Sequence, residues 1–210
     1  GTGNEVVGYH HVNTGLYKGS GDVFLGIPFA EPPIGANRFK RTVPLKRSVG
    51  KFAATKAKPQ CAPQYNESFI EISEDCLYLN VYTPDVSSKT KLPVMVYIHG
   101  GSLITGSASV EVSVQAAISN FVSRGVVLVT PQYRMGIYGF FTTHDERFPP
   151  NRGMYDQVEA LRWVKANIAA FGGDPAKVTL FGESAGAASV NAYMFSPLSQ
   201  NLFHAAILQS

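Results

Sequence analysis

Short apolar runs alternate with amphipathic segments through the second half of the chain. The runs lie in KLPVMVYIHGG, RGVVLVTPQYR and KVTLF, and CLYLNVYTP and HAAILQS also have strand character. Nearly continuous apolar runs are typical of strands that are covered on both faces. In MYDQVEALRWVKANIAAFGGDP the apolar residues step by three or four and share one helical face: Val158, Leu161, Val164, Ile168 and Phe171. Strands that alternate with helices predict an α/β fold with a mostly parallel central sheet.

Two further helices and a small N-terminal sheet complete the predicted elements. VSVQAAISNFVSRG is expected to form a helix that ends at Gly125, and AGAASVNAYMF to form the helix after KVTLF. The first thirty residues hold three strand-like runs, EVVGYH, NTGLYKG and VFLGIPFA, which predict a small antiparallel sheet. Residues 31–66 are rich in proline and lysine and are expected to be irregular.

Composition and charge narrow the class of protein. Of the 210 residues, 45% are hydrophobic and 16% are charged, as in a globular protein with one sizeable core. No apolar run is long enough to span a bilayer, so no membrane span is predicted. The net charge is +3. Between Glu31 and Glu67 there is no acidic residue, and the basic residues there are Arg38, Lys40, Arg41, Lys46, Arg47, Lys51, Lys56 and Lys58. Such a stretch can bind a polyanion or form a solvated surface, and its prolines favour the surface, so no nucleic-acid partner is predicted.

The two cysteines, Cys61 and Cys76, lie fifteen positions apart. No second His/Cys pair has the spacing of metal ligands, so no metal site is predicted. Two interpretations remain open at this point: a local disulfide formed in an oxidising compartment, or two buried free thiols. The sequence Asn66-Glu67-Ser68 between them is a glycosylation sequon. It favours secretion and makes Asn66 a candidate acceptor.

Ser184 stands where the strand KVTLF must turn into the helix AGAASVNAYMF. Side chains two positions before and after it would collide in so tight a turn, and Gly182 and Gly186 remove that collision. The turn would direct the serine hydroxyl outward and place the next backbone N–H groups at a positively polarised helix N-terminus. An acyl-transfer nucleophile needs this arrangement. The alternative is a Gly/Ser turn that serves only the close packing of helix on sheet.

A second glycine-rich turn follows the strand in YIHGGS. Gly100 and Gly101 can bring backbone N–H groups close to a ligand oxygen, as half of an oxyanion hole requires. The alternative is a flexible strand-to-loop turn. His99 is a lone histidine beside a strand, so we expect it to orient this loop rather than to act as a general base.

Six segments occur in the order found in a known family: FLGIPFAEPPIGANRF, SEDCLYLNVYTP, VMVYIHGG, PQYRMGIYGF, LRWVKANIAAFGGDPAKVTLFGESAGAASV and LFHAAILQS. On these segments the chain resembles the type-B carboxylesterases, the cholinesterase-like branch of the α/β-hydrolases. The resemblance implies that residues 1–210 are the N-terminal part of a single α/β-hydrolase domain. It also implies a serine esterase that cleaves small-molecule carboxylic esters through an acyl-serine intermediate and needs no cofactor.

The resemblance assigns roles to individual residues. It makes Ser184 the nucleophile and gives the oxyanion hole to the backbone N–H groups of Gly101, Ser102 and Ala185. The supporting residues are Gly100, Gly182, Glu183 and Gly186. Glu183 would lie behind the serine and tune the site electrostatically, or serve packing and hydrogen bonding alone. Cys61 and Cys76 match the family's first disulfide, and two pairs match structural ion pairs: Arg38 with Glu74, and Arg134 with Asp156.

The chain departs from the family pattern at three places. Ser102 stands where the family usually has a third glycine, which reduces the conformational freedom of one oxyanion donor. Ala187 replaces a common glycine. The loop between the cysteines is shorter than in cholinesterases and contains no tryptophan, since Trp163 is the only one and falls on a predicted helix. Choline esters are therefore not expected as preferred substrates, because a quaternary ammonium needs an aromatic face there.

The catalytic partners of Ser184 are not found in the chain. The fold orders its triad as serine, acid and histidine. Residues 185–210 contain no Asp or Glu, and their only histidine, His204, matches a structural position. The triad Glu and His are therefore expected beyond residue 210, and the 210-residue chain is expected to be inactive alone. The expected location is secreted or in the lumen of the endoplasmic reticulum. The alternative function is that of a non-catalytic, cholinesterase-like adhesion or binding protein.

Overall fold

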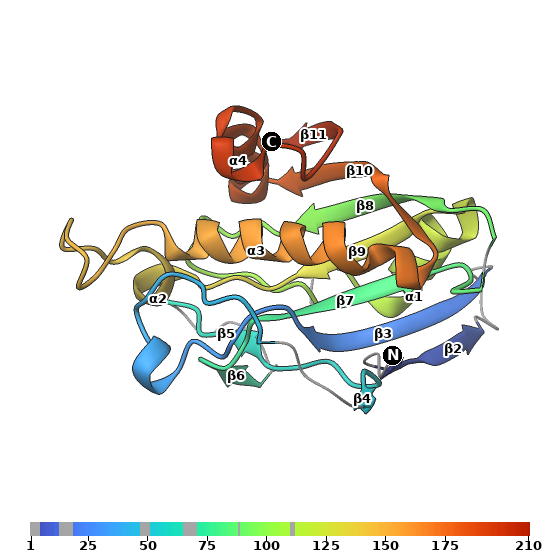
Figure 1. Cartoon of the computed structure of the whole chain (residues 1–210), viewed down its shortest axis with the longest axis horizontal. Helices are drawn as coiled ribbons and strands as arrows, with labels where there is room; N and C mark the ends of the chain where they lie inside the picture. The colour runs from blue at the N-terminus through green and yellow to red at the C-terminus, as the bar shows by residue number, and fades with distance from the viewer. Residues whose placement is uncertain (1–4, 13–18, 47–50, 65–70, 88, 110–111) are drawn as a thin grey trace.

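The computed structural model describes residues 5–12, 19–46, 51–64, 71–87, 89–109 and 112–210 (Figure 1). Two of the predictions lie outside these residues. They are the strand NTGLYKG, of which residues 13–18 are not described, and glycosylation at Asn66.

Seven strands form one central sheet in the order β11-β10-β8-β9-β7-β3-β2. Their bounds are β2 (Tyr9–Val12), β3 (Ser20–Pro28), β7 (Tyr78–Thr83), β8 (Leu92–Ile98), β9 (Val127–Pro131), β10 (Gly173–Glu183) and β11 (Ala205–Gln209). The four strands from β11 to β9 are mutually parallel, whereas β7, β3 and β2 join by antiparallel pairing. The predicted α/β sheet is thus present, with a parallel half and an antiparallel half.

Of the N-terminal strands, β2 and β3 pair antiparallel, as the sequence predicts, but they continue the central sheet instead of forming one of their own. The reason is that β3 pairs with β7 along most of its length, which no local pattern encodes. Two small parallel pairs lie outside the sheet: β1 (Glu5–Val7) with β4 (Lys51–Ala53), and β5 (Gln60–Cys61) with β6 (Ile72–Ser73). For β1 the prediction of antiparallel pairing is wrong, since it pairs parallel with a strand outside the central sheet. Residues 31–64 otherwise hold only the short 3-10 helix η1 (Gly35–Asn37), so the prediction of an irregular segment is confirmed where the chain is described.

Helices cover both faces of the sheet. Their bounds are α1 (Val114–Asn120), α2 (Gly136–Phe140), α3 (Arg152–Asn167) and α4 (Ala185–Phe195), with 3-10 turns η2 (Val122–Arg124), η3 (Ile168–Phe171) and η4 (Pro197–Ser199). Side chains of α3 and α4 share one hydrophobic cluster with β8 and β9, and α1 and η2 form a second cluster with β3 and Leu128. Side chains along β9 alternate between the two faces of the sheet and so contribute to both clusters, because Val127 and Val129 belong to the first and Leu128 to the second. Figure 1 shows α3 running across the face of the sheet.

The predicted helices are largely confirmed. The apolar stripe of α3 and η3 is buried, and the chain turns at Gly172 with a φ of 82°. The helix predicted for VSVQAAISNFVSRG is shorter than expected. It ends at Asn120, and Gly125 closes the separate turn η2. The Arg124 guanidinium donates to the carbonyls of Ser119 and Asn120 at the helix end, and the Ser123 hydroxyl also donates to Ser119 O. Within the described ranges, no helix is both long and apolar enough to cross a membrane.

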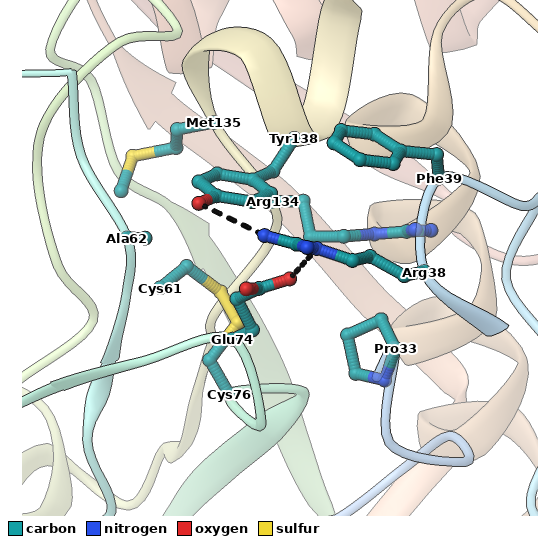
Figure 2. Close-up of a pocket in the computed structure, with 10 residues that line it drawn as sticks. All are labelled: Pro33, Arg38, Phe39, Cys61, Ala62, Glu74, Cys76, Arg134, Met135 and Tyr138. Atoms are coloured by element: carbon teal, nitrogen blue, oxygen red, sulfur yellow. Dashed lines mark hydrogen bonds and ion pairs between the residues drawn. A yellow bond between two sulfur atoms is a disulfide. The ribbon is translucent and has the colours of Figure 1, made fainter. Parts of the chain in front are cut away.

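A disulfide and two ion pairs tie the loops to the sheet, as the family resemblance implies. Cys61 and Cys76 are joined. Figure 2 shows Arg38 between the Glu74 carboxylate, 2.6 Å from its Nε, and the Tyr138 hydroxyl. Arg134 lies close by and contacts both carboxylate oxygens of Asp156 at 2.8 Å. Both residues of this second pair are almost fully buried, so the pair connects the end of β9 to α3 in the protein interior.

Candidate active site

Ser184 occupies a sharp turn between β10 and α4. Its φ of 53° and ψ of −121° lie outside the regions that non-glycine residues normally adopt. Two backbone bonds hold this conformation: the Ser184 N–H donates to Gln209 O at 2.8 Å, and its carbonyl accepts from Ala188 N at 3.0 Å. The residue is exposed. The strand–turn–helix context predicted for this serine is therefore present.

The two flanking glycines are required by backbone contacts. A Cβ on Gly182 would lie 2.5 Å from the backbone carbon of Gly186. A Cβ on Gly186 would collide with the carbonyl oxygen of Ile98 in β8 and lie 2.9 Å from that of His99. The start of α4 thus packs directly on the end of β8, which brings the loop after β8 next to the serine.

This loop, residues 99–106, touches Ser184 through Gly100. A Cβ on Gly100 would lie 3.2 Å from the Ser184 Cβ and 2.8 Å from the Glu183 carbonyl oxygen. Glu183 itself is exposed, and its carboxylate also lies beside Gly100. The structure therefore brings Gly100, Gly182, Glu183, Ser184 and Gly186 together, while the electrostatic role of Glu183 stays a prediction.

The loop backbone takes an uncommon path after Gly100. Gly101, Ser102 and Leu103 have successive positive φ values of 94°, 55° and 62°. A left-handed backbone costs a residue with a side chain about 1–2 kcal/mol, so Ser102 and Leu103 both add strain. Hydrogen bonds hold the far side of the loop, where Leu103 O accepts from Gly136 N at 2.7 Å and Ile104 O accepts from Gln64 N at 2.7 Å.

Three backbone N–H groups at this corner are available as donors. Within the described ranges, no protein acceptor bonds the N–H of Gly101 or of Ser102. Ala185 is the first residue of α4, where an N–H has no acceptor inside the helix. The positive end of the α4 dipole lies at the same place. An anionic oxygen bound at the start of α4 would lie in a favourable field, and its binding by the N–H groups of Gly101, Ser102 and Ala185 stays a prediction.

His99 is a buried, neutral part of the loop. Its Nδ1 is 2.9 Å from Gly100 O, and its ring stacks on Tyr133 with centroids 4.2 Å apart. Burial lowers the His99 pKa to about 4, so the ring is uncharged at neutral pH. These contacts agree with the prediction that His99 orients the loop, and they leave its ring no exposed edge for a general base.

His204 is far from the serine. It precedes β11, and its Nδ1 accepts from Val178 N at 3.2 Å. Val178 lies six residues before Ser184, which along a strand is about 20 Å. The interpretation of His204 as a structural residue therefore agrees with its position.

Sequence reasoning missed two features of the site. Tyr133, in the segment PQYR, packs under the loop, and only its place after a buried strand hinted at this. An open pocket of about 360 Å³ also adjoins the loop. Its described lining consists of Gln64, Ser102, Leu103, Ile104, Gly136, Ile137, Phe140 and Phe141.

The α/β-hydrolase class is defined by a parallel strand that ends at a serine in a strained turn before a helix. A glycine-rich loop from the neighbouring strand lies beside that serine, as Gly100 does here. A family profile described as Carboxylesterase family matches residues 8–210. The chain belongs to this carboxylesterase family.

Individual relatives agree with this assignment. The chain is 48% identical over 203 residues to liver carboxylesterase 1 of Oryctolagus cuniculus. This match covers 90% of the chain and 35% of the relative's length. It is 49% identical over 204 residues to carboxylesterase 1D of Rattus norvegicus, and the match covers 90% of the chain and 35% of that relative. It is 46% identical over 201 residues to the cocaine esterase of Oryctolagus cuniculus, and the match covers 89% of the chain and 37% of that relative. The chain thus spans little more than a third of the length of these relatives.

Proposed function

We propose that this chain supplies the nucleophile and the oxyanion donors of a serine carboxylic-ester hydrolase. The observation that carries the proposal is Ser184, exposed in a strained turn at the start of α4 and in contact with Gly100. The family assignment supports the same chemistry. Residues 1–210 are then the N-terminal part of a single domain.

In the proposed reaction, the Ser184 hydroxyl oxygen adds to the carbonyl carbon of an ester. A histidine from outside residues 1–210, oriented by a glutamate, takes the hydroxyl proton. The carbonyl oxygen becomes an oxyanion that accepts hydrogen bonds from the N–H groups of Gly101, Ser102 and Ala185. Each such donor is worth roughly 3 kcal/mol at the barrier.

The intermediate then collapses. The bond to the alcohol oxygen breaks, that oxygen receives the proton from the histidine, and an acyl-serine remains on Ser184. Water, deprotonated by the same histidine, attacks the acyl carbon and releases the carboxylic acid. Because protein groups carry every proton and charge in this sequence, the mechanism needs no cofactor.

The surroundings of the loop favour neutral, apolar ester substrates. The pocket beside Ser102 is walled by aliphatic and aromatic side chains, and none of its described lining residues is charged. A small apolar group of the substrate fits such a surface. The disulfide between Cys61 and Cys76 favours an oxidising compartment, so we place the protein in the secretory lumen or outside the cell.

The test uses the full-length protein that carries this chain. We expect an organophosphate to label Ser184 and a short acyl ester to be hydrolysed, and Ser184→Ala to abolish both. Ser87→Ala is the matched control, since Ser87 is exposed but lies in the turn after β7. Wild-type protein that neither takes the label nor hydrolyses the ester would reject the enzyme and favour a non-catalytic adhesion or binding protein.

A further inference from the structure

We propose that Tyr133 is a positioning residue for the oxyanion hole: with the His99 ring it fixes two loop carbonyls so that the Gly101 N–H is directed toward the side of Ser184. This inference rests on the proposed function, because it concerns the same site. It assigns a role to a residue that sequence reasoning did not connect with the chemistry.

Tyr133 lies under the loop, two residues after β9, and is fully buried. Its hydroxyl donates to His99 O at 2.9 Å and lies 3.5 Å from Gly100 O. Its ring stacks nearly parallel to the His99 imidazole, with an angle of 18° between the planes. Since a carbonyl only accepts, the His99 Nδ1 at 2.9 Å from Gly100 O carries the proton and donates as well. The His99 Nδ1–H therefore holds the Gly100 carbonyl, and the Tyr133 hydroxyl, whose one proton goes to His99 O, lies beside it.

Gly106 leaves room for this arrangement. A Cβ on Gly106 would lie 2.6 Å from the His99 Nδ1 and 2.7 Å from Gly100 O, and its φ of 108° is itself a glycine conformation. The histidine nitrogen, the carbonyl oxygen and the Gly106 backbone are thus in close contact. A side chain at position 106 would therefore displace the Gly100 carbonyl or the His99 ring.

The direction of the next N–H follows from peptide geometry. The peptide bonds of the described chain are trans, and in a planar trans peptide the C=O and the following N–H point in opposite directions. The Gly100 carbonyl points into the protein, toward His99 and Tyr133. The Gly101 N–H therefore points away from His99 and Tyr133. In the proposed arrangement, this is the side on which Gly100 meets Ser184.

The loop needs such an anchor because its own backbone is strained. Ser102 and Leu103 hold positive φ values that a free loop would relax. Gly136 and Gln64 restrain the far end through Leu103 and Ile104. Tyr133 restrains the near end, at the peptide that carries the first oxyanion donor.

The test compares Tyr133→Phe with the wild type in the full-length protein. Phenylalanine keeps the ring and removes only the hydroxyl. We expect kcat for a short acyl ester to fall about 10-fold or more with KM nearly unchanged, because the loss concerns the transition state. The affinity for a trifluoromethyl ketone, which forms a tetrahedral adduct on serine, should fall by a similar factor. Tyr82→Phe is the matched control, since Tyr82 is also a buried tyrosine but belongs to the cluster on the opposite face of the sheet.

A second pair of variants tests the same inference if Tyr133→Phe fails to fold. His99→Asn keeps a donor near the Nδ1 position and should retain more kcat than His99→Phe, which has none. Unchanged kcat and ketone affinity in Tyr133→Phe, or equal losses in both His99 variants, would overturn the inference while the proposed function stands. A wild type without hydrolysis or organophosphate adduct would overturn both.

Discussion

Replacing Gly186 by alanine separates helix propensity from tertiary packing. Gly186 is the second residue of α4 and has no positive φ. In an exposed helix, alanine is about 1 kcal/mol more favourable than glycine, so helix propensity taken alone predicts that Gly186→Ala stabilises the protein. The structure predicts instead that Gly186→Ala destabilises the protein.

The new methyl group has no space. It would collide with Ile98 O and lie 2.9 Å from both His99 O and the Ile98 carbonyl carbon. These are backbone atoms of β8 and its loop, so relief requires a shift of α4 away from the sheet. Overpacking of this kind costs up to about 3 kcal/mol, and the propensity gain offsets about 1 kcal/mol of it. We expect a net loss of about 2 kcal/mol, together with reduced esterase activity, because the shift separates Ala185 from the loop donors.

The assay is denaturant unfolding of the full-length protein, with the midpoint as the readout. Ala188→Gly is the control in the same helix, since Ala188 is exposed. It should cost about 1 kcal/mol from propensity alone. Gly186→Ala and Ala188→Gly, which are opposite exchanges of glycine and alanine, would then both lower the unfolding free energy. A Gly186→Ala protein as stable as the wild type, or more stable, would refute the packing argument.

Two further predictions concern buried charge. Asp156→Asn removes the buried partner of Arg134 and should cost about 3–5 kcal/mol in unfolding free energy, whereas Glu146→Gln in the exposed pair with Arg41 should cost under about 0.5 kcal/mol. Similar losses in both would contradict the burial argument. The His99 pKa of about 4 lies below its ordinary 6.5, so the unfolded chain binds the proton first as pH falls. Unfolding free energy should therefore drop by about 3 kcal/mol from pH 6.5 to 4. His99→Asn should lack this component, and an unchanged pH profile in that variant would contradict it.

Much of the site was predictable because its signals are local. The collision that requires glycine at 182 involves Gly186, only four residues away, whereas the collision that requires glycine at 186 involves Ile98 in β8 and is not local. The apolar run before Ser184 marks the strand that the turn must end. The helix predicted from AGAASVNAYMF has the same bounds as α4. The turn, its exposure and the following helix therefore agree with the pattern in the sequence.

The loop donors were predictable only in part. Gly100 and Gly101 marked a close backbone approach, but the left-handed conformations of Ser102 and Leu103 contradict their local preferences. Hydrogen bonds from Gly136, Gln64 and Tyr133 hold neighbouring carbonyls of the loop. No pattern within the loop itself reports these partners.

By itself, the sequence determined most strands of the central sheet, the helices α3 and α4, the serine turn and the family, because each depends on neighbours within about one element or on segments matched in order. The tertiary structure decided which strands joined one sheet, since β3 pairs with β7 across more than fifty residues. It also decided that Tyr133 lies under His99, 34 positions away in the chain. Such contacts depend on the three-dimensional packing of distant segments, and a linear pattern of apolar and polar residues does not specify their partners.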